Sequence, residues 1–276
     1  MRPAADATSA APQLPAAALR WLPLAAAIGA LALAAVRLAE DGWRPPVLWL
    51  LAMLLGATLY HASFGFAGAY RRMIVARDMR GVQAQLLLLA VATVLFAPVL
   101  SAGAVFGHAI GGAWAPVGVS VVAGAFLFGI GMQLAGGCGS GTLYTAGGGN
   151  PRMLLGWDPS TSAFWQSDFQ STALAGGVMQ DTTSLMDLGI MLGALCAAAL
   201  AGRFSPQWRM PWRSLAAALI GGLAIGYGAR IAYGCNIGAF VSGVASGSLH
   251  GWLWIAAALP GTWIGVRLRP VFGLAN

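Results

Sequence analysis

The sequence predicts an all-α polytopic membrane protein, and three observations support that prediction. Of 276 residues, 58% are hydrophobic and only 8% are charged. The mean hydropathy over the whole chain is +0.74, and the fifteen basic residues, all arginine, stand in short groups between apolar runs. A soluble domain carries about a quarter charged residues, so this chain has too few polar side chains to cover a water-facing surface. An ordinary soluble enzyme is therefore excluded, and the net charge of +7 fits orientation in a membrane better than binding of nucleic acid.

Seven apolar runs are candidate membrane-spanning helices, because a crossing helix needs about 20 apolar residues. They cover residues 16–38, 46–70, 81–102, 117–135, 188–202, 215–226 and 249–266. We expect residues 1–15, which are rich in Ala and Pro, to form a mobile tail before a single transmembrane domain, 16–276. This domain divides into a first half (16–155), a polar connecting segment (156–187) and a second half (188–276).

Arginine groups between the apolar runs predict how the chain is oriented. These groups are Arg71, Arg72, Arg77 and Arg80, then Arg203, Arg209 and Arg213, and finally Arg267 and Arg269. Because cytoplasmic loops carry an excess of basic residues, we expect all three groups and both termini to be cytoplasmic. The helices that lead into Cys138 and Cys235 then cross the membrane in opposite directions.

An internal repeat is the strongest pattern in the sequence. Residues 129–141 and 226–238 both read G-x-G-x-x-x-A-x-G-C-x-x-G, with six identical positions at equal offsets. Together with the opposite crossing directions, this predicts a pseudo-symmetric inverted repeat. Glycine clusters at membrane depth expose backbone N–H groups that lipid cannot satisfy, so we expect re-entrant or broken helices whose N-termini face a central anion site. The alternative is that these glycines only allow helices to pack closely.

The two Gly-Cys turns of the repeat supply the candidate site. A buried thiol stays protonated, offers a weak S–H donor and contacts sulfur without a full charge, which suits a sulfur-containing anion. The alternative is that both cysteines are small buried apolar residues. The candidate substrate-binding residues are Cys138, Cys235, Gly137, Gly139, Ser140, Gly141, Thr142, Gly234, Asn236, Gly238 and Arg230. Arg230 is placed either to draw anions to the mouth of the site or to reach the membrane interface.

The other chemistry-bearing residues indicate no further site. Three cysteines make neither a disulfide framework nor a zinc set, and Cys196 is expected to pack as an apolar residue. His61, His108 and His250 lack metal-ligand spacing, so we expect local hydrogen bonds instead. Tryptophans are expected in interfacial belts, namely Trp43, Trp49, Trp114, Trp252 and Trp254. We expect no catalytic residue, no metal and no cofactor.

Two long motifs resemble those of the YeeE/YedE family of membrane proteins. One covers residues 136–144 with the glycines 147–149 after it, and the other covers residues 227–240 and 247–252. The resemblance extends over most of the chain from about Phe64 onward. Members of that family are implicated in thiosulfate uptake across the bacterial inner membrane. The resemblance therefore implies a pseudo-symmetric helical fold in which Cys138 and Cys235 contact the terminal sulfur of the substrate through S–H to S hydrogen bonds, without covalent chemistry.

The sequence departs from that family after Leu155. Where relatives continue into further hydrophobic helices, this chain turns to Gly156-Trp157-Asp158-Pro159 and a polar segment, which predicts an internal deletion. Residues 157–187 carry four Asp and no basic residue. The positive-inside tendency therefore does not hold this segment in the cytoplasm, and we expect an external loop or short helices there.

Three functions are compatible with these patterns. The first is an inner-membrane permease for thiosulfate or a similar sulfur or selenium oxyanion. The second is a non-transporting or partner-dependent subunit, or a degenerate paralogue of that family, suggested by the gap after Leu155. A membrane sulfurtransferase ranks third, since neither turn carries a C-x-x-C motif or an adjacent His that would activate its cysteine. Candidate partners are the sulfur anion, the lipid bilayer, a cytoplasmic sulfur-carrier protein and a further copy of the chain, but not nucleic acid.

Overall fold

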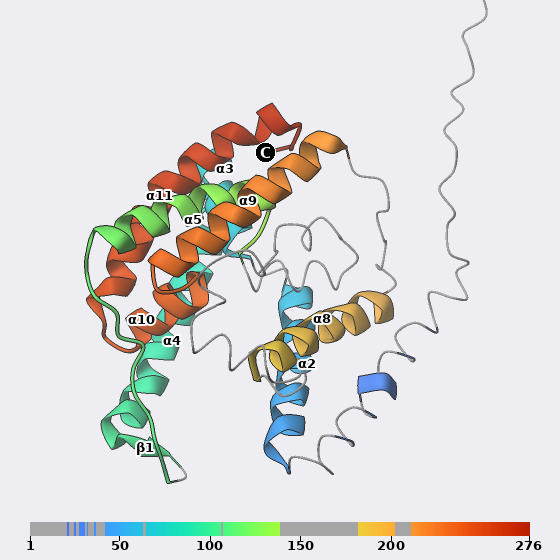
Figure 1. Cartoon of the computed structure of the whole chain (residues 1–276), viewed down its shortest axis with the longest axis vertical. Helices are drawn as coiled ribbons and strands as arrows, with labels where there is room; N and C mark the ends of the chain where they lie inside the picture. Colours follow the sequence, from blue (N-terminus) through green and yellow to red (C-terminus); the bar gives the residue numbers. More distant parts are fainter. Residues whose placement is uncertain are drawn as a thin grey trace, which may run out of the picture.

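The computed structural model shows a protein built mainly of apolar helices (Figure 1). It describes residues 42–62, 65–105, 107–138, 182–201 and 211–276, together with scattered residues between 21 and 36. The expected first span, 16–38, lies mostly outside the described residues, and those of its residues that are described are helical. The connecting segment expected at 156–187 lies outside them up to residue 181.

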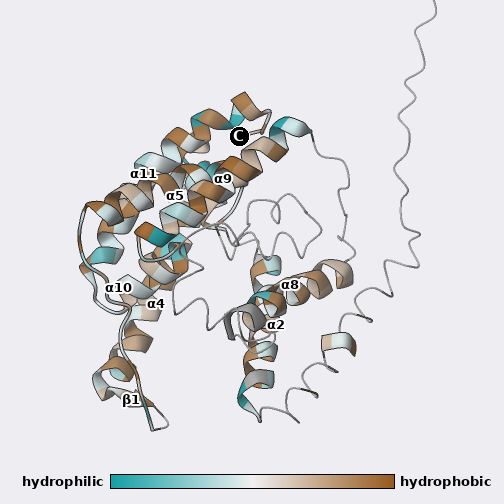
Figure 2. Ribbon diagram, in the orientation of Figure 1, coloured by the Kyte–Doolittle hydropathy of each residue, from teal (hydrophilic) through white to brown (hydrophobic). Residues whose placement is uncertain are grey.

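The helices follow the predicted apolar runs in order along the chain. They are α2 (Arg44–Ala62), α3 (Phe66–Ala76), α4 (Arg80–Ala102), α5 (Val119–Ala135), α8 (Thr182–Leu200), α9 (Trp212–Ile231), α10 (Ser242–Ala245) and α11 (Leu249–Leu268). A π-helix, η2 (Asn236–Val241), leads into α10, and a 3-10 helix, η3 (Arg269–Phe272), follows α11. Hydrophobic residues cover most of these ribbons (Figure 2).

Several of these helices fit a lipid environment. By length and composition, Arg80–Ala102 and Trp212–Ala245 are long and apolar enough to cross a membrane, and so is Pro46–Ala76, which includes residues 63–64 outside the described part. Val119–Ala135 and Met186–Leu200 are shorter apolar helices. Large apolar side chains such as Leu87, Val94 and Leu95 on α4 are exposed in the structure, as they would be on a surface that faces lipid tails. These features support the prediction of a membrane protein.

Two local details differ from the expected pattern. The expected span 46–70 is interrupted, since α2 ends at Ala62 and α3 begins at Phe66 with an extended Gly65 as its N-cap. After α4, the strands β1 (Ala104–Val105) and β2 (His108–Ala109) form a short antiparallel pair, which an all-α expectation did not include. The glycines that flank β1 and β2 have positive φ angles, 68° at Gly103 and 79° at Gly107, and such angles permit tight reversals that interrupt a helix.

The core of the described chain is a three-helix unit in which α5 lies between α9 and α11 (Figure 1). Helix α11 runs parallel to α5, and its Gly261 and Gly265 lie against the backbone of Phe126 and Ile130. Small residues let helix backbones approach closely, which is a main source of association between membrane helices. Gly261 and Gly265 lie outside the internal repeat, so this contact does not decide between the two interpretations of the repeat glycines.

Helices α5 and α9 meet antiparallel through two pairs of glycines. A Cβ atom added to Gly131 would lie 2.6 Å from the Gly221 carbonyl oxygen, and one added to Gly228 would lie 2.6 Å from the Gly124 carbonyl oxygen. The pairing runs in both directions, since a Cβ on Gly221 or Gly124 would lie within 2.8 Å of the oxygen of its partner. No side chain larger than hydrogen fits at these four positions without moving a backbone.

Helices α2 and α8 form a second pair, drawn apart from the three-helix unit (Figure 1). Gly56 and Gly193 place the two backbones in contact, at Ile190 and Met53 respectively. Trp49, expected in an interfacial belt, is only 2% exposed, because it packs inside this pair with Leu188 and Leu192. The prediction for Trp49 was therefore wrong, whereas Trp43 and Trp114 are exposed as expected.

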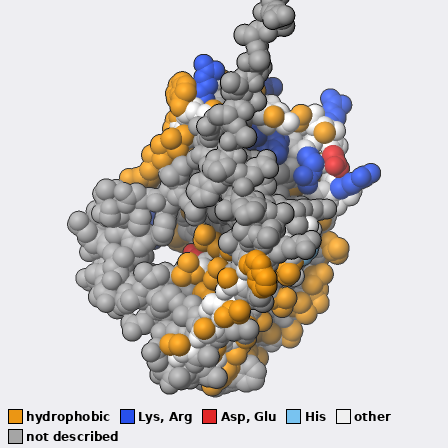
Figure 3. Space-filling model, turned by 90° about the vertical axis from the view of Figure 1, so that its right-hand side faces the viewer, with side chains coloured by type: hydrophobic (Ala, Val, Ile, Leu, Met, Phe, Trp, Pro, Cys, Tyr) orange, Lys and Arg blue, Asp and Glu red, His pale blue; other side chains and the backbone are white. Residues whose placement is uncertain are grey.

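A buried arginine, Arg269, forms a hydrogen bond with the C-terminal end of α5. Arg269 is 7% exposed, and its Nη1 donates a 2.6 Å hydrogen bond to the carbonyl oxygen of Gln133 in the last turn of α5. A cation is favoured at this end because the unsatisfied carbonyls there carry the negative end of the helix dipole. On the face shown in Figure 3, arginine side chains gather toward the upper end, and hydrophobic side chains cover most of the rest of the described surface.

Candidate functional site

The first Gly-Cys segment begins where α5 ends. Gly136 has a left-handed φ of 88°, and its N–H donates to the Met132 carbonyl oxygen at 3.1 Å. Glycine is favoured at this position because L side chains rarely adopt positive φ. Gly137 is buried and Cys138 is 2% exposed. The next four predicted site residues, 139–142, lie outside the described residues.

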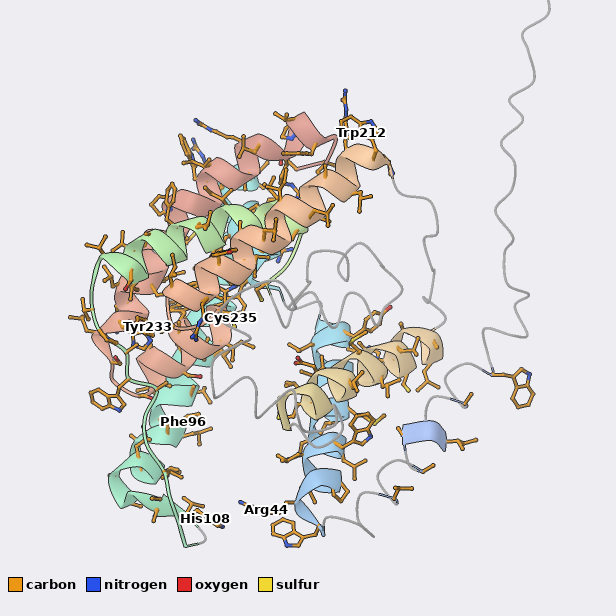
Figure 4. All side chains as sticks on the ribbon, viewed as in Figure 1. Arg44, Phe96, His108, Trp212, Tyr233 and Cys235 are labelled. Atoms are coloured by element: carbon orange, nitrogen blue, oxygen red, sulfur yellow. The ribbon has the colours of Figure 1, made fainter. Side chains whose placement is uncertain are left out.

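The second Gly-Cys segment follows α9 (Figure 4). Tyr233 and Gly234 both have positive φ, 60° and 142°, and the Gly234 N–H donates to the Ala229 carbonyl oxygen at 2.8 Å. A Cβ on Gly234 would lie 2.8 Å from the Ala239 nitrogen, so only glycine fits there. The chain reverses at this point, and Cys235 becomes the N-cap of η2.

The structure brings the two predicted cysteines together, although they are far apart in the sequence. Cys138 belongs to the main apolar cluster, and Cys235 packs against the same cluster. The two thiols lie close enough to interact electrostatically, and Cys138 interacts in the same way with the Tyr70 hydroxyl of α3. Aromatic and aliphatic side chains, Phe128, Phe240 and Trp254 among them, make up much of the surroundings. A soft anion between the thiols would therefore sit in a largely apolar environment.

Asn236, another predicted site residue, joins the two halves of this site. Its side chain is fully buried, and Nδ2 donates to the Met132 sulfur of α5 at 3.2 Å. The Asn236 Oδ1 atom has no hydrogen-bond partner among the described residues. This bond links the helix before Cys138 to the residue after Cys235.

The start of η2 presents backbone donors beside Cys235. The Cys235 sulfur lies near the N–H groups of Ile237 and Gly238, without the full geometry of a capping hydrogen bond. The first N–H groups of a helix have no acceptor within that helix, and they form its positive end. Gly238, the last glycine of the repeat, is exposed and has open space around its Cα. Donors for an anion and a thiol for its sulfur are thus adjacent here.

The two residues expected at equivalent places in the repeat, Gln133 and Arg230, have different surroundings. Gln133 is fully buried, and its Nε2 donates to the Ala67 carbonyl oxygen at 3.0 Å. Arg230 is exposed in the last turn of α9, near the exposed Tyr227. An arginine there is not part of the buried cluster around the cysteines.

Trp254 holds the second Gly-Cys segment in place, a role that the sequence analysis missed. Expected at an interface, Trp254 is instead 0% exposed. Its Nε1 donates to the Gly234 carbonyl oxygen at 3.1 Å, and its ring contacts Phe128 edge-on with centroids 5.1 Å apart and stacks on Phe240 at 6.4 Å. A tryptophan in an apolar helix gives no sequence signal that separates burial from an interfacial position.

We predict that Trp254→Phe destabilises the protein by about 1–3 kcal/mol, because the half-buried Gly234 carbonyl loses its donor. The matched control is Trp252→Phe on the same helix, since Trp252 is 52% exposed and should tolerate the change. The measurement is thermal unfolding of the two variants in the same detergent. Equal unfolding temperatures for Trp254→Phe and Trp252→Phe would contradict this role.

His250 behaves as the sequence predicted. It is buried, and its Nδ1 lies 2.7 Å from the Ser248 hydroxyl oxygen, so it makes a local hydrogen bond. Within the part of the chain that the structure describes, no three His, Cys, Asp or Glu side chains are grouped as metal ligands would be. The candidate site therefore rests on thiols, backbone N–H groups and apolar contacts.

The chain is similar in sequence to known membrane transport proteins. A family model described as sulphur transport matches residues 61–157 and 157–264, so one matched stretch contains Cys138 and the other contains Cys235. A probable transporter YedE of Escherichia coli is 34% identical over 167 residues, which cover 58% of this chain and 39% of that protein. The thiosulfate transporter TsuA of Spirochaeta thermophila is 45% identical over 78 residues, or 28% of this chain and 23% of TsuA.

A third relative extends the same pattern. The thiosulfate transporter TsuA of Escherichia coli is 33% identical over 96 residues, which cover 35% of this chain and 26% of that protein. The chain thus spans about two-fifths of the length of YedE and about a quarter of the length of the TsuA proteins. The family model covers most of the chain, and the resemblance that the Gly-Cys motifs carry is confirmed. The chain belongs to the sulphur transport family, the family of the YeeE/YedE membrane proteins.

Proposed function

We propose that the chain is an inner-membrane permease for thiosulfate or a similar sulfur-containing anion. The observation that carries this proposal is the approach of the Cys138 and Cys235 thiols in an apolar cluster. Relatives named as thiosulfate transporters support the substrate class. Held as neutral thiols, the cysteines contact the terminal sulfur in turn and pass the anion along by S–H to S hydrogen bonds, with no covalent step.

Backbone donors complete the recognition of the anion in this proposal. The N–H groups of Ile237 and Gly238 face the region of Cys235, and the positive end of a helix favours an anion. We propose that residues 139–142, which follow Cys138 as residues 236–239 follow Cys235, donate hydrogen bonds to the anion beside Cys138. Arg230, exposed at the end of α9, is proposed to attract anions to the entrance from outside the apolar cluster.

The glycine contacts between α5 and α9 support an inverted repeat. Positions 131 and 228 are equivalent in the repeat, and so are 124 and 221 at the same offset. If the two segments of the repeat are exchanged, the contact of Gly131 with Gly221 becomes the contact of Gly228 with Gly124. In both contacts the added Cβ would lie 2.6 Å from the carbonyl oxygen of the facing glycine. Two antiparallel helices with exchangeable contacts are what a pseudo-twofold axis in the membrane plane produces. We propose that both termini are cytoplasmic, on the positive-inside tendency of the arginine groups.

The test of this function is uptake of radiolabelled thiosulfate into vesicles reconstituted with the full chain alone, compared with empty vesicles. Excess unlabelled thiosulfate should suppress the uptake. Sulfate should suppress it less, because it has no terminal sulfur for the thiols. Vesicles with correctly folded protein and no uptake above the empty control would overturn the proposal.

A partner-dependent subunit is the second candidate, because the chain spans only 39% of YedE. In that case the chain would bind thiosulfate but need another protein to complete its path through the membrane. Uptake by the chain alone would exclude this candidate. Binding without uptake, restored when membrane extract from the source cells is added, would favour it.

A further inference from the structure

An unpartnered hydroxyl lies beside the first cysteine of the site. Tyr70, in the middle of α3, is 2% exposed, and its ring packs against Phe66 with centroids 6.3 Å apart. Its Oη atom has no hydrogen-bond partner among the described residues. Burial of a hydroxyl without a partner costs free energy, so this group is unexplained by the packing of the protein alone.

The surroundings of this hydroxyl point toward a ligand. Tyr70 and Cys138 share one apolar cluster, and their polar atoms interact electrostatically. Two more buried atoms without partners near the cysteine segments, Gln133 Oε1 and Asn236 Oδ1, are acceptors, which would repel the oxygen of an anion. The Tyr70 hydroxyl can donate. Gln85 Nε2 on α4 and Thr262 Oγ1 on α11 are also buried donors without hydrogen-bond partners among the described residues, whereas Tyr70 interacts electrostatically with Cys138.

A sulfur oxyanion has two chemically different ends. Its terminal sulfur is soft and suits a thiol, whereas its oxygens accept hydrogen bonds from O–H or N–H groups. A thiol alone does not distinguish thiosulfate from any other anion with an exposed sulfur. A neutral hydroxyl close to Cys138 can donate a hydrogen bond to an oxygen of the anion. Such a donor would favour sulfur anions that carry oxygen over those that do not.

We propose that the Tyr70 hydroxyl donates a hydrogen bond to an oxygen of the sulfur oxyanion whose terminal sulfur lies against Cys138, so that Tyr70 sets the specificity of the site for oxyanions. This inference rests on the proposed function and deepens it. At Cys235 the corresponding donors are the N–H groups of Ile237 and Gly238. The anion therefore meets one thiol and at least one donor at each of its two positions.

The experiment compares Tyr70→Phe with wild type in vesicles that contain the full chain. The matched control is Tyr60→Phe, which removes the same hydroxyl from α2, outside the cysteine cluster. We expect the KM for thiosulfate to rise about tenfold in Tyr70→Phe, because the variant loses one hydrogen bond to a charged group. The KM should stay unchanged in Tyr60→Phe. Hydrosulfide, an anion with sulfur but no oxygen, should show the same KM in all three proteins.

A stability measurement separates this role from a structural one. Without thiosulfate, Tyr70→Phe should unfold at the wild-type temperature or above, because the lost hydroxyl had no partner in the protein. With thiosulfate, the increase in unfolding temperature should be smaller than in wild type, since at a fixed concentration a ligand that binds more weakly stabilises the folded protein less. A lower unfolding temperature without thiosulfate would assign the hydroxyl to the fold and overturn the inference.

The outcomes distinguish the inference from the function on which it rests. Equal thiosulfate KM values in wild type and Tyr70→Phe would overturn the role of Tyr70 and leave the permease proposal standing. Absence of uptake by wild type would overturn the permease proposal. In that event, a thiosulfate-induced stabilisation that is equal in wild type and Tyr70→Phe overturns the inference, and one that is reduced in Tyr70→Phe supports it.

Discussion

Replacement of either site cysteine, Cys138→Ala or Cys235→Ala, is expected to lower thiosulfate uptake by roughly 10- to 100-fold. A hydrogen bond to a charged group contributes about 1.5–3 kcal/mol, and each factor of ten in affinity corresponds to about 1.4 kcal/mol. The loss should be at the upper end of this range, because the third cysteine, Cys196, lies in α8 and no described thiol in the cluster can replace the one that is removed. The measurement is initial uptake rate in reconstituted vesicles, normalised to folded protein.

The matched control for these variants is Cys196→Ala. Cys196 is half-buried in α8, within the separate α2–α8 pair, so its removal should leave uptake unchanged. The conservative variants Cys138→Ser and Cys235→Ser keep a donor but lose the soft sulfur, and we expect them to retain part of the rate. Wild-type uptake in both alanine variants would refute passage between the two thiols.

The second large effect is expected from a single methyl group at the α5–α9 contact. In Gly228→Ala the new Cβ would lie 2.6 Å from both the Gly124 carbonyl oxygen and the Phe128 nitrogen. The two backbones must then separate, and overpacking of this kind costs about 1–3 kcal/mol or more. We expect a clear fall in unfolding temperature and a smaller monodisperse fraction after extraction in detergent.

A second glycine on α9 provides a matched control for the Gly228→Ala substitution. Gly226, two residues away, has no heavy atom within 4 Å of an added Cβ, so Gly226→Ala should be tolerated. Gly131→Ala, at the position equivalent to Gly228, should lose as much stability as Gly228→Ala, because its Cβ would also lie 2.6 Å from a carbonyl oxygen. If the unfolding temperature fell for only one of Gly131→Ala and Gly228→Ala, the contacts in the two halves would not be equivalent.

Sequence reasoning recovered the elements that depend on apolar runs and on glycine. Helix α5 ends directly before Gly136, and the turn that follows α9 contains Gly234, and the positive φ of these two glycines is a backbone requirement that the residue type reveals. The repeat also led us to expect that both Gly-Cys turns share a central site, and the structure places Cys138 in one apolar cluster and Cys235 against it. Family membership followed from the long motifs around these two residues.

The residues that sequence reasoning missed are those whose environment depends on tertiary packing. Trp49 and Trp254 were expected at interfaces and are buried, because a membrane interior and a protein core are equally apolar and hydropathy does not separate them. Tyr70 was passed over for the same reason, as a tyrosine in a short apolar helix. The interruption between α2 and α3 has only a single glycine, Gly65, as its local signal.

The close contact between α5 and α9 has a consequence for how the proposed permease would open and close. Many transporters with inverted repeats alternate access by rocking one half against the other. Here the facing helices of the two halves touch through backbone atoms at Gly124, Gly131, Gly221 and Gly228, so rocking at this joint would drive carbonyl groups into Cα atoms. In the proposed permease the pair would then move as one rigid body, and opening and closing would fall to smaller parts such as the π-helix η2, a helix type that is frequent at functional sites.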